Sequence, residues 1–228
     1  MADGYLTSDG VRFLRELGTH NEKAWFEKNK ARFEEGVRAP TQRLIADLAP
    51  VLEKISPHFV VDLRPNGGSL SRIHRDTRFS KDKSPYKTHL FAHFHHEDGS
   101  EECSPGFFLR LGPGESAVGA GVWRPGPAAL AKIRAAMVTD AAAWRKAKQK
   151  VLAAGGRVIP GEPLKKVPKG FDPEHEHAED LKHKSVGLVL DLPDAALTSP
   201  SLPKEIAERF RLAAPAVRFV CAAVGLDA

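Results

Sequence analysis

The sequence predicts an α+β fold: a central antiparallel sheet of about five to six strands, flanked by N-terminal and C-terminal helices. Apolar residues repeat at helical spacing towards both ends of the chain, whereas they alternate in short segments in the middle. Glycine-rich turns separate these segments and are too short for the helical crossover that parallel strands need. Central strands with helices at both ends are typical of α+β proteins. The 228 residues contain no repeat and no linker, so a single domain over residues 1–228 is expected.

Three helices are expected at the N-terminal end. Thr7 or Ser8 can cap the first of them, and Asn21 can cap the second. Pro40 fits the first turn of the third helix, and Pro57 follows its end. The apolar residues that repeat at helical spacing are Val11, Leu14 and Leu17 in the first helix, Trp25, Phe26, Phe33 and Val37 in the second, and Leu44, Ile45, Leu48, Leu52 and Ile55 in the third.

Strands are expected in the middle of the chain, and helices return after it. Segments of alternating polarity, bounded by turn residues, predict strands. Trp123, at the end of one such segment, either borders a site or fills the core, and the core interpretation is favoured. The expected strands are residues 58–64, 69–76, 88–95, 106–111, 115–123 and 186–192, and the expected later helices are residues 127–138, 141–154, a short helix before residue 186, and the segment from Pro203 onward.

Composition places the chain among ordinary globular proteins, with 42% hydrophobic and 28% charged residues. No apolar run approaches the roughly 20 residues that a membrane helix needs. The first ten residues have neither the basic nor the apolar region of an export signal, so a cytoplasmic location without membrane association is expected. Cys103 and Cys221 lie far apart in the sequence, and a disulfide between them is not expected in a reducing compartment.

One stretch, RIHRDTRFSKDKSPYK at residues 72–87, concentrates positive charge. Its six arginines and lysines and its two aspartates give a local charge of +4, against +5 for the whole chain. The alternation typical of a strand ends after Asp76, and the residue before Pro85 is disfavoured in a helix. This basic stretch is therefore expected to form an irregular loop between two neighbouring strands.

The density of cations has two interpretations. The first is a solvated network of Arg–Asp pairs, worth about 0.2–1 kcal/mol each. The second is a site for a phosphorylated or other anionic small molecule, because arginine matches phosphate or carboxylate bidentately and lysine adds a mobile charge. In this hypothesis Asp76 orients the guanidinium groups. The expected anion-binding residues are Arg72, Arg75, Asp76, Arg78, Lys81, Lys83, Tyr86, Lys87 and His89.

Other functions stay open. A nucleic-acid-associated module is less favoured, because the net charge of +5 is modest and acids interrupt the basic stretch. An enzyme acting on a phosphorylated substrate would use His74 or His89 as proton carrier, since histidine titrates near neutral pH. A purely structural loop within a protein assembly is the third alternative. His89, His93 and His95 share one face of a strand, but no carboxylate or cysteine completes an obvious metal site nearby, so no metal or other cofactor is assigned.

The run RIHRDTRFSKDKSPYKTH resembles the signature of a mainly bacterial family, domain of unknown function 2461. That signature is an Arg, two other residues, Arg-Asp, then Arg-Phe, and shortly after a Lys before a Tyr. It falls here on Arg72, Arg75, Asp76, Arg78, Phe79, Lys83 and Tyr86. The resemblance extends along nearly the whole chain, through FLRELGTHNEKAWFEKNKARFEE, VWRPGPAALAKIR and PKGFDPEHEHAEDLKHKS. It implies that the basic stretch is one structural unit, and it implies no particular activity, cofactor or partner.

Overall fold

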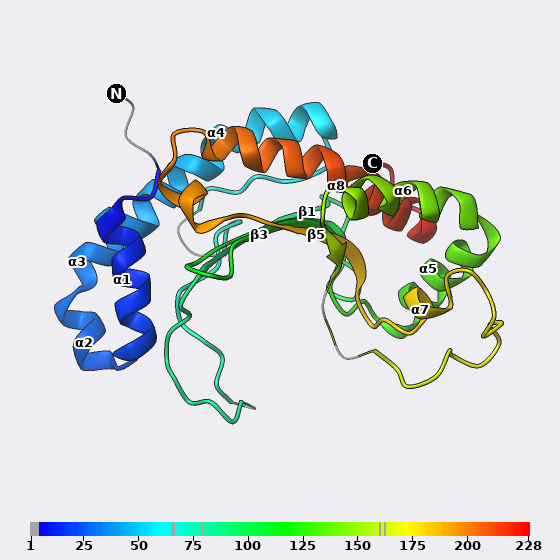
Figure 1. The fold of residues 1–228 in the computed structure, drawn as a ribbon, viewed down its shortest axis with the longest axis horizontal. Coiled ribbons are helices and arrows are strands. Elements are labelled where there is room, and N and C mark those ends of the chain that lie inside the picture. The colour runs from blue at the N-terminus through cyan, green and yellow to red at the C-terminus, as the bar shows by residue number, and fades with distance from the viewer. Residues whose placement is uncertain (1–4, 65–66, 79, 160, 162) are drawn as a thin grey trace.

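The computed structural model describes residues 5–64, 67–78, 80–159, 161 and 163–228, and it confirms the α+β fold (Figure 1). The N-terminal part is helical, as expected from its apolar periodicity. Its elements are α1 (Ser8–Thr19), α2 (Lys23–Lys28), α3 (Lys30–Phe33), the π-helical segment η1 (Glu34–Arg38) and α4 (Ala39–Ile55).

Two expected helix starts have different outcomes. The prediction for Thr7 is confirmed, because its hydroxyl caps α1 by accepting a hydrogen bond from the Gly10 amide at 3.0 Å. The prediction for Asn21 is wrong, because α2 begins after Glu22 without a side-chain cap. Asn21 Nδ2 donates instead to the carbonyl of Tyr86 at 2.9 Å, and Asn21 Oδ1 accepts from the Tyr86 amide at 3.0 Å. Asn21 therefore ties the basic stretch to the junction between α1 and α2.

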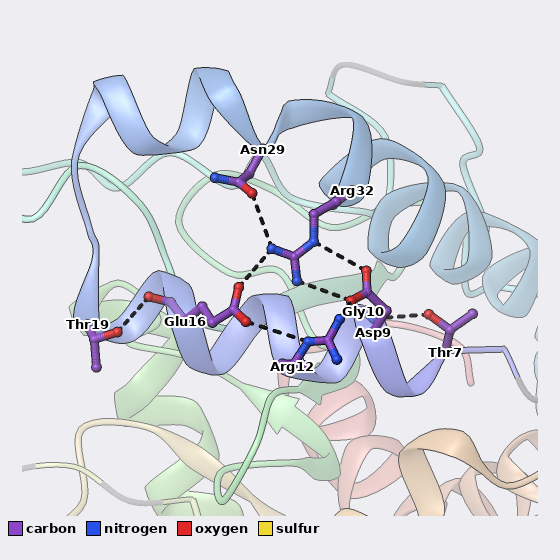
Figure 2. Close-up of polar contacts among 8 residues, drawn as sticks. All are labelled: Thr7, Asp9, Gly10, Arg12, Glu16, Thr19, Asn29 and Arg32. Atoms are coloured by element: carbon purple, nitrogen blue, oxygen red, sulfur yellow. Dashed lines mark hydrogen bonds and ion pairs between the residues drawn. The ribbon is translucent and has the colours of Figure 1, made fainter.

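The guanidinium of Arg32 joins α3 to α1 (Figure 2). Its Nε and Nη2 donate to the two carboxylate oxygens of Asp9 at 3.3 and 3.2 Å, and Nη1 donates to Glu16 at 2.7 Å. Nη1 also reaches Asn29 Oδ1 at 3.2 Å. The hydrogen bond from Arg32 lowers the pKa of Asp9 below its ordinary value. This network holds α1 against α3, and with α1 it positions the turn that carries Asn21.

The strands found in the described residues form one antiparallel sheet with the order β1-β2-β3-β5-β4. The prediction of strands in the centre of the chain is confirmed for β1, β2, β3 and β5. The sequence did not predict β4, because two residues are too few to show a period. The strands are β1 (Leu90–His95), β2 (Gly106–Leu111), β3 (Ala117–Val122), β4 (Arg157–Val158) and β5 (Val186–Asp191).

The predictions of strands at residues 58–64 and 69–76 are wrong. The chain folds back between these segments, where the Ser69 amide donates to the Asp62 carbonyl at 2.7 Å. Both segments therefore lie along the outer edge of β1 and divide this short edge between them, so Phe59 and Leu70 make only one bridge each there. The bridge of His74 lies outside β1. The isolated bridges of these segments are Phe59–His96, Leu70–Ala92 and His74–Tyr86.

One face of the sheet is covered by α8 (Leu202–Val224), with α4 beside it (Figure 1). Phe210 of α8 packs edge-on against Phe94 and Phe107, with ring centroids 5.9 and 5.1 Å away. These aromatic rings belong to the larger of two buried clusters, and Trp144 belongs to the other. The remaining helical elements are α5 (Pro127–Thr139), α6 (Ala141–Ala153), α7 (Ala178–Leu181) and the 3₁₀ helix η2 (Asp194–Thr198).

The opposite face of the sheet borders a groove of about 990 Å³. We call it the sheet groove; Phe91, Phe108, Gly121 and Val189 line it along the strands. The expectation that Trp123 lies in the core is wrong, because its side chain is 61% exposed and borders this groove. Successive residues of a strand point to opposite faces of the sheet. The side chain of Val122 is buried in the core, so Trp123 points to the side of the groove.

Candidate functional site

A second pocket, of about 560 Å³, lies where the basic stretch meets the α1–α2 junction and the turn between β2 and β3. We call it the polar pocket. Its lining contains three cations and three carboxylates, so its chemistry depends on which of these charges are already paired. The lining residues are Gly18, Asn21, Arg75, Asp76, Asp82, Ser84, Tyr86, Lys87, Thr88, His89, Arg110 and Glu115.

The structure brings together five of the nine residues predicted to bind an anion. Those that line the polar pocket are Arg75, Asp76, Tyr86, Lys87 and His89. Arg78 donates instead to Asp76 at 2.6 Å on the exposed side of the loop, and Lys83 Nζ donates to the Thr77 carbonyl at 2.9 Å. Arg72 and Lys81 are also outside the lining of this pocket in the described chain, and Phe79 lies outside the described residues.

Tyr86 anchors the basic stretch to the helical part of the molecule. Its side chain is only 3% exposed, and its ring stacks on Phe26 of α2 with centroids 4.1 Å apart. Burial raises the pKa of the Tyr86 hydroxyl above its ordinary value. The packing of this ring, together with the backbone contacts of Asn21, fixes the end of the stretch from which Lys87 and His89 extend.

The aspartates of the basic stretch are engaged with their own neighbours. Asp82 Oδ1 accepts hydrogen bonds from the Ser84 hydroxyl at 2.6 Å and the Ser84 amide at 2.9 Å, and Oδ2 accepts from Arg75 Nη1. These bonds, with those from Ser84 first, hold the pKa of Asp82 far below its usual range. The hydrogen bond from Arg78 likewise lowers the pKa of Asp76 to about 2. Both carboxylates are therefore ionised at neutral pH and already paired.

Lys87 differs from the other charged residues of the pocket. Its ammonium donates to the Ser71 hydroxyl and to the Arg72 carbonyl, both at 3.0 Å. Among the residues that the structure describes, no carboxylate forms an ion pair with it. Burial, and next the charge of Arg72, lower the pKa of Lys87 below its ordinary value.

Glu115, in the turn between β2 and β3, contacts three other side chains that line the polar pocket. Its Oε1 accepts from the Thr88 hydroxyl at 3.1 Å and lies 3.0 Å from His89 Nδ1. Its Oε2 accepts from Arg110 Nη2. Arg110 projects from β2, and its Nε is buried without a hydrogen-bond partner in the described part of the chain.

The protonation of His89 follows from these contacts. Nδ1 lies 3.0 Å from Glu115 Oε1, which can only accept, and 3.1 Å from Arg110 Nη2, which can only donate. Since Arg110 Nη2 already donates to Glu115 Oε2, we assign the proton to Nδ1 and direct it to Glu115 Oε1. Burial lowers the pKa of His89, followed by the charge of Arg110, which lies 3.1 Å from Nδ1. The ring is therefore neutral at pH 7, and its Nε2 is an acceptor.

The histidines at positions 89, 93 and 95 do not all contact one another. His93 and His95 are neighbours on the same face of β1, with ring centroids 6.2 Å apart, whereas His89 precedes the strand and contacts Glu115. In the described ranges, no group of three or more His, Cys, Asp or Glu residues is arranged to hold a metal ion. Burial, with a contribution from His95, lowers the pKa of His93 to about 4.

Three important residues of the polar pocket were missed by reasoning from the sequence: Asn21, Arg110 and Glu115. Arg110 had a signal, because a charged residue interrupts the apolar segment GFFLRL at an outward-facing position. Glu115 is one acid in a hairpin turn, and Asn21 resembles an ordinary helix cap. Neither of them shows a local pattern that predicts contact with the basic stretch.

Fold and pocket together define an α+β protein with a charge-lined pocket beside an antiparallel sheet. The chain belongs to the family described as "Conserved hypothetical protein (DUF2461)", which matches residues 9–219, so the resemblance seen in the sequence is confirmed. No curated protein and no solved structure matches the chain. In the part of the chain that the structure describes, no helix combines the length and apolar character needed to cross a membrane.

Proposed function

We propose that the polar pocket binds a phosphorylated or other anionic small molecule. The observation that carries this proposal is Lys87, a partly buried ammonium that lines the pocket without a carboxylate partner among the described residues. Burial of a charge without a counter-charge costs free energy. An anion in the pocket would offset this cost, and it would form a charge-assisted hydrogen bond with Nζ.

Two guanidinium groups supplement Lys87, one from the same basic stretch and one from β2. Arg75 is held by Asp82, and Arg110 is held by Glu115. Each ion pair uses only part of the five N–H donors of an arginine and fixes the orientation of the others. The buried Nε of Arg110 is one donor without a partner in the described chain. Three cations, two from the basic stretch and one from β2, with their carboxylates already engaged, are suited to a multidentate oxyanion such as phosphate.

Replacement of Lys87 by methionine is expected to weaken the binding of inorganic phosphate about ten- to a hundredfold, because a charged hydrogen bond is worth roughly 1.5–3 kcal/mol. Methionine retains the length of the side chain and removes only the charge and the donors. Isothermal titration calorimetry of both proteins with phosphate at pH 7 measures the difference.

The matched control for this experiment is Lys81→Met. It removes the same charge from the same loop, but Lys81 is exposed and outside the lining of the polar pocket. Its phosphate affinity is expected to stay within about twofold of the wild-type value. An equal loss in both variants, or no phosphate binding by the wild-type protein, would contradict the proposal.

The contact between His89 and Glu115 favours a second candidate function, general acid–base catalysis on the bound anion. A carboxylate that orients a neutral imidazole leaves the other ring nitrogen to take a proton from a nucleophile. If the protein hydrolyses a phosphomonoester, the His89→Gln variant is expected to lose at least about a hundredfold in turnover. It should still bind phosphate within about threefold of wild type; turnover that survives the substitution would exclude this role.

A further inference from the structure

We propose that the ligand also has an elongated apolar part, which lies in the sheet groove while its anionic head occupies the polar pocket. The protein would thus bind an amphiphile with a phosphate or carboxylate head. This inference rests on the proposed function of the polar pocket and adds the class of molecule to it.

The two cavities adjoin one another. His89, Arg110 and Glu115 line both the polar pocket and the sheet groove. A molecule whose head is held near Arg110 would therefore place its remaining atoms along the strands that line the sheet groove. The charges of the polar pocket stand at only one end of this path, which fits a ligand with charge at one end.

Aromatic side chains and a glycine line the sheet groove where it runs over the strands. Phe91 and Phe108 stack across β1 and β2 with centroids 6.1 Å apart. Gly121 has a φ of +146°, and a Cβ at this position would overlap the carbonyl oxygen of Val186. The same Cβ would also overlap the Cα of Gly187 on β5. Position 121 therefore requires glycine, and the backbone of β3 itself lines the groove there.

Trp123 borders the groove beyond the end of β3. Its 61% exposure leaves a large apolar surface in water, and Arg124 lies over the ring at 5.7 Å from its centroid. Arg124 has a φ of 43°, a left-handed conformation that is unfavourable for an arginine, and its amide donates to the Ser185 hydroxyl at 3.1 Å. From Ala117, which pairs with Arg110, to Trp123 the chain rises roughly 20 Å.

The charged groups Arg157, Asp191 and Asp194 on the rim of the groove already have partners. Arg157 Nη1 donates to Asp191 at 2.6 Å. Asp194 accepts from Arg15 at 3.2 Å and from the Gly114 amide at 2.7 Å. These pairs leave the exposed floor to apolar contacts, so the occupant is an apolar chain or ring system and not a polar polymer.

The test compares butyl phosphate with decyl phosphate, the latter below its critical micelle concentration, by isothermal titration calorimetry with the full chain. Complete removal of one methylene from water is worth about fourfold in affinity. The added chain is partly buried in an open groove, so decyl phosphate is expected to bind at least about tenfold more tightly than butyl phosphate. 1-Decanol, which lacks the anionic head, is expected to bind at least about tenfold more weakly than decyl phosphate.

Two variants locate the alkyl chain. Phe91→Ser and Phe108→Ser are each expected to bring decyl phosphate within about threefold of butyl phosphate. Both should bind butyl phosphate as the wild type does, which also shows that they fold. Leu152→Ser is the matched control, because it removes a side chain that is 44% exposed on α6, away from the groove, and is expected to retain the full difference.

Four results would overturn this inference. Equal affinity of the wild type for butyl and decyl phosphate would exclude the apolar subsite and leave the proposed function intact. No binding of inorganic or butyl phosphate would remove the proposed function and the inference with it. Equal affinity for 1-decanol and decyl phosphate would show that the groove binds an alkyl chain without any contribution from the polar pocket. A ligand-free dimer that Phe108→Ser dissociates would assign the groove to a second copy of the chain.

Discussion

A Gly10→Ala variant is expected to lose about 2–3 kcal/mol of unfolding free energy, because the backbone of η1 lies directly against α1 at Gly10. A Cβ on Gly10 would overlap the carbonyl oxygen of Gly36 and lie 2.9 Å from its carbonyl carbon. Both are backbone atoms, so no flexible side chain can yield and the two helical segments must separate. Urea unfolding measures the loss, which corresponds to a melting temperature roughly 5–10 °C lower for a chain of this size.

The reciprocal substitution, Gly36→Ala, is the matched control. A Cβ on Gly36 would have its nearest neighbour, the Cα of Gly10, at 3.5 Å, which is an ordinary contact. Alanine also favours helical backbone over glycine by up to about 1 kcal/mol. This variant is expected to be as stable as the wild type or slightly more stable. Equal destabilisation by both substitutions would contradict the asymmetric contact. The position of α1 also matters for the polar pocket, since its end leads into Asn21.

Acidification from pH 6.5 to 4.5 is expected to cost about 2–3 kcal/mol of stability through His93 alone. Burial, with the charge of His95 as a second cause, lowers the pKa of His93 from 6.5 to about 4. Between these two values the unfolded chain binds a proton at this residue and the native protein does not. The unfolded state is therefore favoured as the pH falls through this window, and the loss is complete once the pH is below about 4.

The contribution of His93 is isolated with a His93→Gln variant. Urea unfolding at pH 7.5 and pH 4.5 gives the loss of stability on acidification for the wild type and for the variant. The amount by which the wild type loses more is the contribution of His93. Other acid-labile interactions, such as the Asp9 and Asp76 ion pairs, are present in both proteins and cancel. A His93→Gln variant that loses as much stability on acidification as the wild type would contradict a buried, neutral His93.

The sequence predicted those parts of the fold that depend on local interactions. The Thr7 cap and the turn after β2 are set by residues within a few positions of one another. The strand predictions at residues 58–64 and 69–76 failed because their composition suits a strand, but strand formation also requires a free partner edge. The two segments had to share one edge of β1 for hydrogen bonding. No local sequence pattern shows that two segments compete for the same edge.

The sequence also located five of the candidate site residues, because they lie in one basic stretch. The local charge of +4 meant that some cations had no acid within that stretch, but it did not show which. In the structure Arg75 and Arg78 pair with Asp82 and Asp76, whereas Lys87 is held by a hydroxyl and a carbonyl. That distinction depends on the backbone path, which only tertiary contacts determine.

Local sequence patterns were enough to predict the α+β class, the family, and the segment that supplies most of the polar pocket. Only the tertiary structure brought Asn21, Arg110 and Glu115 to that segment and exposed Trp123 beside a groove. Helix caps and strand alternation are set by neighbours along the chain, so they leave a readable pattern. Pairing of a side chain with a partner far along the chain depends on how the sheet and helices pack, and it leaves no such pattern.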